Sequence, residues 1–213
     1  IGIAAGLAMS GKVVYVYSII PFITMRCFEQ IRLDLAYNNA NVKLVGVGAG
    51  FTYGSMGSSH HAIEDISIMR SIPNMTVLCP GDPFETEELI KRSYEKNGPV
   101  YIRLGKNGEP TIHKNKNKIK IGELIPITTG NDLILITTSN TLELAKSWVD
   151  EWNMDGVKVN LVSAPTIKPI NQLSVLKLIN RNIPIITLEE HNIVGGLGST
   201  ISEIIAESGK GVT

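Results

Sequence analysis

Two adjacent histidines, His60 and His61, stand in a glycine- and serine-rich stretch and could do acid–base chemistry. An imidazole takes up and releases a proton near neutral pH, which few other side chains do. The stretch follows an apolar run at residues 42–47 that predicts a buried strand, and an apolar helical pattern begins at Ile63. We therefore expect flexible backbone to deliver the imidazoles to the first turn of a helix, at the edge of a sheet where ligands bind.

The same stretch permits other interpretations. A metal site would need carboxylates or thiolates beside the histidines, and Glu64 and Asp65 are more simply explained as helix-surface residues. Ser59 precedes His60, but there is no Gly-x-Ser-x-Gly elbow, and sequence neighbours rarely have the geometry of a catalytic triad. We expect no metal ligand from this chain, and a tight turn with two surface histidines stays open as the alternative.

Three further features could bind ligands or could simply be structural. Glycines at 195–198 precede a helix but lack the full dinucleotide-binding spacing, so we expect close helix–strand packing there. Phe22 follows a strand and could be a core residue or could stack on a heterocycle. Arg103 and Lys106 end another predicted strand, where they could meet an anionic substrate or solvent.

Composition narrows the class of protein. The chain has 213 residues, 43% of them hydrophobic, and its 20 Lys+Arg balance 20 Asp+Glu. Zero formal charge argues against a nucleic-acid partner, and no apolar run reaches the roughly 18 residues that would predict a membrane span. Cys27 and Cys79 are far apart and sit in apolar surroundings, so we expect reduced thiols and a cytoplasmic location.

Strand and helix patterns alternate along the whole sequence. This order predicts an α/β fold of two domains, each a mostly parallel sheet flanked by helices. We place the first domain at residues 1–107, a lysine- and asparagine-rich linker that includes His113 at 108–121, and the second domain at 122–213. The chain opens inside an apolar helix without a capping residue, so we expect the first domain to be truncated. The predicted strands are 13–20, 42–47, 75–79, 100–104, 133–138, 158–163 and 185–188, and the long predicted helices include 22–37, 83–96, 141–152 and 171–180.

Several motifs in order carry a family resemblance over essentially the whole chain. They are GIAAGLA at 2–8, PFITMRCFEQIR at 21–32, GSMGSSHHAIED at 54–65, MRSIPNMTVL at 69–78, PGDP at 80–83 and EEHNIVGGLGS at 189–199. The sequence resembles the C-terminal half of transketolase, a pyrimidine-binding domain followed by the transketolase C-terminal domain. The separately encoded C-terminal transketolase subunits and transketolase-like proteins are similar to it.

The resemblance implies a role for individual residues. Phe22 matches the aromatic residue that stacks on the aminopyrimidine of thiamine diphosphate, with Ile19 and Met25 lining the same slot. His60 matches the histidine that contacts substrate hydroxyls and assists proton transfer. The substrate-facing positions that it implies are Met56, Ser59, Arg26, Arg103 and Lys106.

The implied reaction moves a two-carbon ketol unit from a ketose to an aldehyde, with thiamine diphosphate as the cofactor. The family's activating glutamate would lie just before Ile1, and the motif that holds the diphosphate and Mg²⁺ is absent from this chain. The resemblance therefore implies a partner, the N-terminal pyrophosphate-binding half or subunit, in a homodimer or heterotetramer. Alone, the chain is expected to be inactive.

Two residues differ from the usual pattern of the family at positions that the resemblance places near the substrate. Met56 stands where the family loop usually has an acidic residue, and Gly48 where it often has a histidine. A thioether accepts a hydroxyl hydrogen bond poorly, which predicts a ketose or 2-oxo acid other than the usual pentose phosphates. A deoxyxylulose-phosphate synthase-like protein, a 2-oxo-acid dehydrogenase beta-like protein and a non-catalytic assembly partner remain as alternatives.

Overall fold

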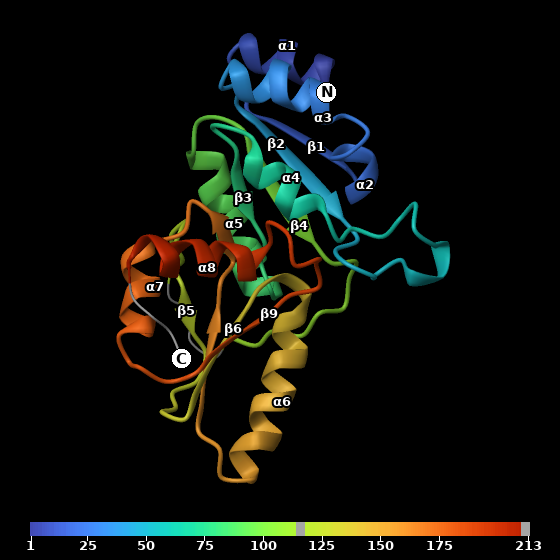
Figure 1. Ribbon diagram of the computed structural model, residues 1–213. Coiled ribbons are helices and arrows are strands. Elements are labelled where there is room, and N and C mark those ends of the chain that lie inside the picture. The colour runs from blue at the N-terminus through green and yellow to red at the C-terminus, as the bar shows by residue number, and fades with distance from the viewer. Residues whose placement is uncertain (114–117, 210–213) are drawn as a thin grey trace.

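The computed structural model describes residues 1–113 and 118–209. Figure 1 shows the first part of the chain, blue to green, above the second part, yellow to red, and each is built around its own sheet. The α/β class and the mostly parallel sheets flanked by helices are confirmed. Of the predicted linker, 114–117 lie outside the described residues, as do 210–213 of the second predicted domain.

The first sheet brings three strand ends to one edge. Ile19 is in register with Val47, and Val47 with Leu104, so parallel β1, β2 and β4 all end together. The β-branched residues of β2 and β4 suit strands that are covered on both faces, whereas β1 at the sheet edge alternates between more and less buried residues. In the described chain the sheet has the order β1-β2-β4-β3-β8, made of β1 (Val14–Ile19), β2 (Val42–Val47), β3 (Thr76–Leu78), β4 (Val100–Leu104) and β8 (Thr166–Lys168).

The helices of the first part are shorter than predicted. The predicted helix over 22–37 is broken, because residues 24–27 form a turn between two short helices. Asp82 caps α5 by accepting from the Glu85 amide at 2.8 Å, which confirms the predicted helix start. The described helices of this part are α1 (Gly2–Met9), α2 (Ile20–Ile23), α3 (Phe28–Gln30), the π-helix η1 (Ile31–Tyr37), the 3₁₀ helix η2 (Gly54–Met56), α4 (Asp65–Ser71) and α5 (Pro83–Glu95).

The second sheet repeats the alternation of strand and helix. Parallel β6, β7 and β9 follow the predicted strands, and β5 adds an antiparallel edge that the sequence did not predict. The order is β5-β7-β6-β9 in the described residues. Its elements are β5 (Ile125–Pro126), β6 (Leu133–Thr137), η3 (Ser139–Thr141), α6 (Leu142–Met154), β7 (Val159–Ser163), α7 (Gln172–Ile179), β9 (Ile185–Leu188) and α8 (Leu197–Glu207).

Strand β8 joins the two parts of the chain. It belongs to the second part by sequence but pairs antiparallel with β3 of the first sheet, through Leu78 and Thr166. The Cys79 amide extends this pairing by donating to the Pro165 carbonyl at 2.8 Å. One buried apolar cluster accordingly contains residues of both parts, among them Leu44 and Ile201.

Two sequence-based expectations concern thiols and membranes. Cys27 and Cys79 are both free, as predicted, and Cys79 is buried. Within the described chain, no helix has the length and apolar character that a membrane crossing requires.

Because the core is shared, we expect a cavity at the junction to destabilise both parts together. Ile167 of β8 is buried in the common cluster, so Ile167→Ala should lower the free energy of unfolding by about 2–5 kcal/mol. Leu173→Ala is the control, since Leu173 is 70% exposed. Urea unfolding followed by circular dichroism should show one transition at lower midpoint for Ile167→Ala. Two separated transitions in the wild-type protein would contradict the shared core.

Candidate active site

Phe22 and His60 meet at the edge where β1 and β2 end. Phe22 lies on α2, one residue after Pro21, and its half-buried ring stands edge-on to the His60 imidazole, with ring centroids 5.1 Å apart. The Ser59 hydroxyl lies 3.0 Å from His60 Nδ1. Predicted site residues from two separate motifs, Phe22 from 21–32 and Ser59 with His60 from 54–65, are therefore brought together.

A planar cation covers one face of Phe22. The Arg26 guanidinium carbon lies 4.4 Å from the ring centroid, and Arg26 itself is exposed. A flat, polar group can therefore stack on this ring, and an exposed side chain occupies that face in the structure. Met25 is exposed beside Arg26, and Ile19 is half-buried at the end of β1.

Lys106 reaches the same cluster from the end of β4. Its Nζ lies 5.6 Å from the Tyr53 ring centroid, and that ring lies 6.2 Å from the His60 ring. Tyr53 is thus a member that the sequence analysis missed, because an isolated tyrosine in a loop carries no pattern. Met56 lies in η2 of the same loop and is 55% exposed.

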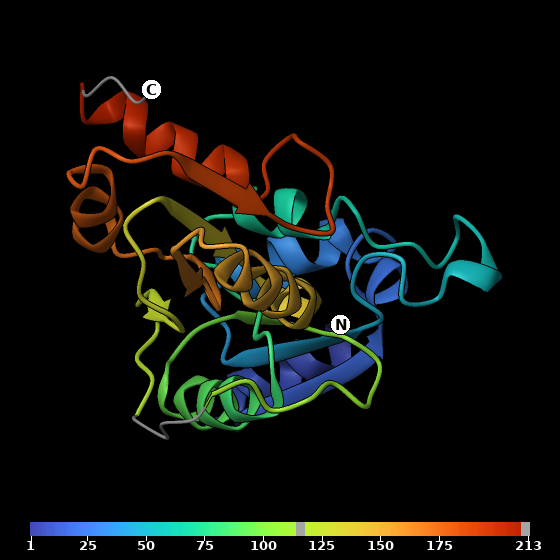
Figure 2. The same cartoon turned by 90° about the horizontal axis from the view of Figure 1, so that it is seen from below.

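The histidines do not lie in a helix, contrary to expectation. The loop that carries them, residues 51–61, projects from the body in both views, as the cyan segment of Figures 1 and 2. Helix α4 begins only at Asp65. The glycines of the loop favour tight local turns over a continuous helix. His61 is turned to the Gly54 carbonyl, 3.3 Å from Nε2, and to the Phe51 ring.

Arg103 is a structural residue in this arrangement and not an exposed anion ligand. It is 1% exposed, and its Nε donates to Asp65 Oδ2 at 2.9 Å. Asp65 is fully buried as well and also accepts from the Tyr101 hydroxyl at 2.6 Å, which corrects its assignment to the helix surface. Burial, and then the charge of Asp65, raise the pKa of Tyr101 well above its ordinary value, so the hydroxyl stays a donor.

His113 is likewise buried and not part of a solvated linker. Its Nδ1 lies 2.9 Å from Asp82 Oδ2, and its Nε2 lies 3.4 Å from Glu85 Oε1. Burial raises the pKa of Glu85 to about 7. Burial alone would also raise the pKa of Asp82, but hydrogen bonds from His113 and from backbone amides outweigh it and lower this pKa to about 2.

The glycines at 195–198 include a close helix–strand contact, as expected: a Cβ on Gly198 would lie 3.1 Å from the Thr187 hydroxyl of β9. Leu197 and Gly198 donate their amides to the Glu189 carboxylate at 2.7 and 2.8 Å, so the start of α8 already holds an anion of its own chain. A Cβ on Gly196 would clash with the same carboxylate. Among the residues that the structure describes, no group of three or more His, Cys, Asp or Glu could hold a metal ion.

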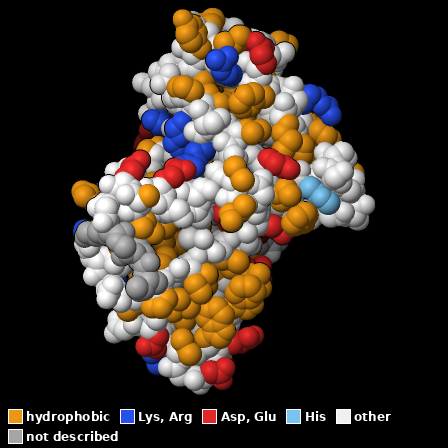
Figure 3. All heavy atoms as spheres, viewed as in Figure 1, with side chains coloured by type: hydrophobic (Ala, Val, Ile, Leu, Met, Phe, Trp, Pro, Cys, Tyr) orange, Lys and Arg blue, Asp and Glu red, His pale blue; other side chains and the backbone are white. Residues whose placement is uncertain are grey.

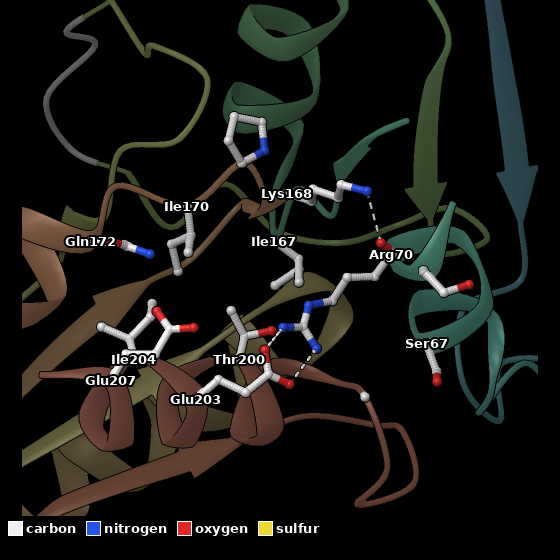
Figure 4. Close-up of a pocket in the computed structure, with 13 residues that line it drawn as sticks. Ser67, Arg70, Ile167, Lys168, Ile170, Gln172, Thr200, Glu203, Ile204 and Glu207 are labelled. Atoms are coloured by element: carbon white, nitrogen blue, oxygen red, sulfur yellow. Dashed lines mark hydrogen bonds and ion pairs between the residues drawn. The ribbon is translucent and has the colours of Figure 1, made fainter. Parts of the chain in front are cut away.

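One cavity borders the predicted site, and a second lies away from it. One of about 350 Å³ lies at the ends of β2 and β4 and is lined by Lys106, Glu109 and Asn140 among others. Another, of about 580 Å³, lies between α4 and α8, where Arg70 and Glu203 point toward one another and form an ion pair (Figure 4). None of the predicted site residues lines this second cavity, so it is separate from the cluster around His60.

Comparisons with known proteins match the whole chain. The family model described as transketolase, pyrimidine binding domain matches residues 1–110, and the one described as transketolase, C-terminal domain matches residues 122–212. A similar curated relative is a subunit of the apulose-4-phosphate transketolase of Actinobacillus succinogenes, 36% identical over 100% of this chain and 68% of the relative. A putative transketolase C-terminal section of Methanocaldococcus jannaschii is 38% identical over 98% of this chain and 66% of the relative.

A solved structure shares the fold over nearly the full length. It is described as a split gene transketolase, inactive beta4 tetramer, and is 32% identical with a TM-score of 0.88. The match covers 97% of this chain and 67% of that one. The chain therefore spans about two thirds of the length of these relatives.

The buried acids predict how stability depends on pH. Glu85 holds its proton more tightly in the folded state, with a pKa raised from 4.5 to about 7, so its contribution to stability is lost as the pH rises through this window. The pKa of Asp82 is lowered on folding instead, from 3.8 to about 2. Its contribution to the free energy of unfolding is therefore lost as the pH falls through that range. We expect Glu85→Gln to flatten the fall in unfolding free energy between pH 4.5 and 7, measured by urea titration. A slope equal to that of the wild type would contradict the assignment.

Proposed function

The chain belongs to the transketolase family, and on this premise we propose that it is the pyrimidine-binding and C-terminal part of a ketol-transferring enzyme. The whole enzyme would depend on thiamine diphosphate and would move a two-carbon unit between sugar or sugar-phosphate substrates. The observation that carries this proposal is the meeting of Phe22, His60 and Lys106 at one sheet edge. Transketolase names on the matched relatives favour this activity over the synthase-like and dehydrogenase-like alternatives.

The residues around Phe22 fit the pyrimidine ring of the cofactor. A planar guanidinium already stacks on Phe22, so an aminopyrimidine can take that face when exposed Arg26 swings aside. Ile19 and Met25 would line the edges of the slot. When bound, thiamine diphosphate supplies the nucleophilic thiazolium carbon that makes and breaks the carbon–carbon bond.

His60 would act as a general acid–base group, taking a proton from a substrate hydroxyl and returning it. Ser59 engages Nδ1, so Nε2 is the nitrogen that we assign to proton exchange. Lys106, an exposed ammonium near Tyr53, would bind an anionic group on the far end of the sugar. Exposed Met56 on the same loop offers only a weak hydrogen-bond acceptor. Sugars whose binding needs an acceptor for a hydroxyl group at this position would therefore bind poorly.

We propose further that a partner subunit completes the site. It would bind the diphosphate and Mg²⁺; among the described residues of this chain, no group of three or more His, Cys, Asp or Glu could hold a metal ion. Exposed apolar side chains support an assembly: Ile3 on α1 is 85% exposed and Tyr37 at the end of η1 is 82% exposed. Apolar side chains also gather over α6 in Figure 3, where Met154 is 85% exposed. We place the assembly in the cytoplasm, which fits its two free thiols.

Reconstitution tests the function and the role of His60 together. Mixing the chain with the pyrophosphate-binding subunit, thiamine diphosphate and Mg²⁺ should give ketol transfer that neither subunit shows alone.

In the reconstituted complex, His60→Ala should lower turnover by a factor on the order of 10²–10⁴, because general acid–base catalysis contributes about that much. His61→Ala is the matched control and should stay within a few-fold of wild type. Equal turnover in His60→Ala and wild type would remove the role assigned to His60.

Phe22→Ala tests the cofactor slot. Loss of an aromatic stacking partner should raise the Kd for thiamine diphosphate by up to about tenfold, measured by calorimetry on the reconstituted complex. Phe51→Ala is the control, since Phe51 is exposed and packs on His61. A large fall in melting temperature with unchanged affinity would instead make Phe22 a core residue.

A further inference from the structure

The loop of residues 51–61, which carries His60, closes at a narrow base. Gly50 and Ala62 exchange two backbone hydrogen bonds of 3.0 and 2.9 Å and form an isolated antiparallel bridge. Inside the loop, the backbone hydrogen bonds are local turns, such as His60 N to the Gly57 carbonyl at 3.0 Å. The direction in which His60 points therefore depends on how this base is held.

The second part of the chain holds the exit of the loop. Asn192 donates twice to the Ile63 carbonyl, from its backbone amide at 3.0 Å and from its side-chain Nδ2 at 2.7 Å. Its Oδ1 accepts from the Val194 amide at 2.8 Å, which fixes the orientation of the side-chain amide. Arg103 Nη2 adds a bridge between the Ala62 carbonyl at 2.9 Å and the Glu190 carbonyl at 3.0 Å.

The same segment also covers the entry of the loop. Gly50 has a φ of +59°, and a Cβ built on it would clash with the Glu190 carboxylate. Asn140 Nδ2 donates to Glu190 Oε2 at 2.5 Å and so keeps this carboxylate in place. Residues 190–192 thus contact both strands of the base, Gly50 on one side and Ala62–Ile63 on the other.

We propose that the segment 190–192 positions His60 for ketol transfer and that Asn192 is its positioning residue, an inference that rests on the function proposed above. Asn192 touches neither His60 nor Phe22 in the described structure; it acts through the Ile63 carbonyl and the base of the loop. The C-terminal part of the chain would thereby determine the geometry of a site formed by the N-terminal part. Catalysis depends on such geometry, because a misplacement of about 1 Å can cost up to 10²-fold in rate.

The first test measures the loop directly in the isolated chain. Asn192→Asp replaces the donating amide by a carboxylate that faces the Ile63 carbonyl and still accepts from the Val194 amide, whereas Asn192→Ala removes both side-chain hydrogen bonds. Both variants lose the side-chain donor to Ile63 and should speed amide hydrogen exchange in peptides covering 49–64 by about tenfold, the effect of losing that hydrogen bond. Asn171→Asp is the matched control, since Asn171 caps α7 and aspartate caps equally well. If the aspartate variant does not fold, the alanine variant decides.

The second test uses the reconstituted complex and separates positioning from stability. Asn192→Ala should lower kcat by about tenfold with KM within twofold, whereas a purely structural role would lower the melting temperature and leave kcat unchanged. Unchanged exchange in both variants, or faster exchange with wild-type kcat, would overturn the proposal. A wild-type complex without ketol transfer would instead overturn the proposed function, and the exchange measurement would still decide whether Asn192 anchors the loop.

Discussion

A single buried guanidinium connects the elements on which the site depends. Arg103 uses all five of its N–H donors, toward Asp65, Ser139, Asn140 and the carbonyls of Ala62 and Glu190. These partners lie on α4, on the loop base and on two segments of the second part. Leaving a buried cation without its charged partner destabilises a fold by roughly 3–5 kcal/mol. The guanidinium therefore favours the arrangement in which all these segments stay in hydrogen-bonding contact with it.

The core and the candidate site are organised differently. Apolar packing fixes the two sheets and their junction through residues of both parts. His60, in contrast, lies on a loop whose own backbone hydrogen bonds are short turns; its ring contacts Phe22 and Tyr53, and polar contacts hold the base of the loop. The apolar core thus fixes the sheets, while the His60 imidazole lies on a loop outside that core.

Sequence patterns predict the strands and helix ends that depend on interactions between residues close in the chain. The apolar run at 42–47 and the Asp82-Pro83 helix start predict the correct strand and cap, since strand propensity and capping act over a few residues. Strand β8 has three residues between two prolines and is too short for a periodic pattern. The burial of Arg103 and of His113 depends on acids 38 and 31 positions earlier in the chain, which spacing alone does not pair. The assignment of Phe22 to a pyrimidine-binding slot rests on the family resemblance and not on periodicity.

The pairing of β8 with β3 has a consequence for how the chain can be divided. Without β8, the fully buried strand β3 would present open amide and carbonyl groups and an apolar surface at the edge of its sheet. Such an edge is a template for pairing with other chains and favours aggregation. The two matched family domains are therefore separate in sequence, but the sheet of the first is completed at one edge by a strand from the second.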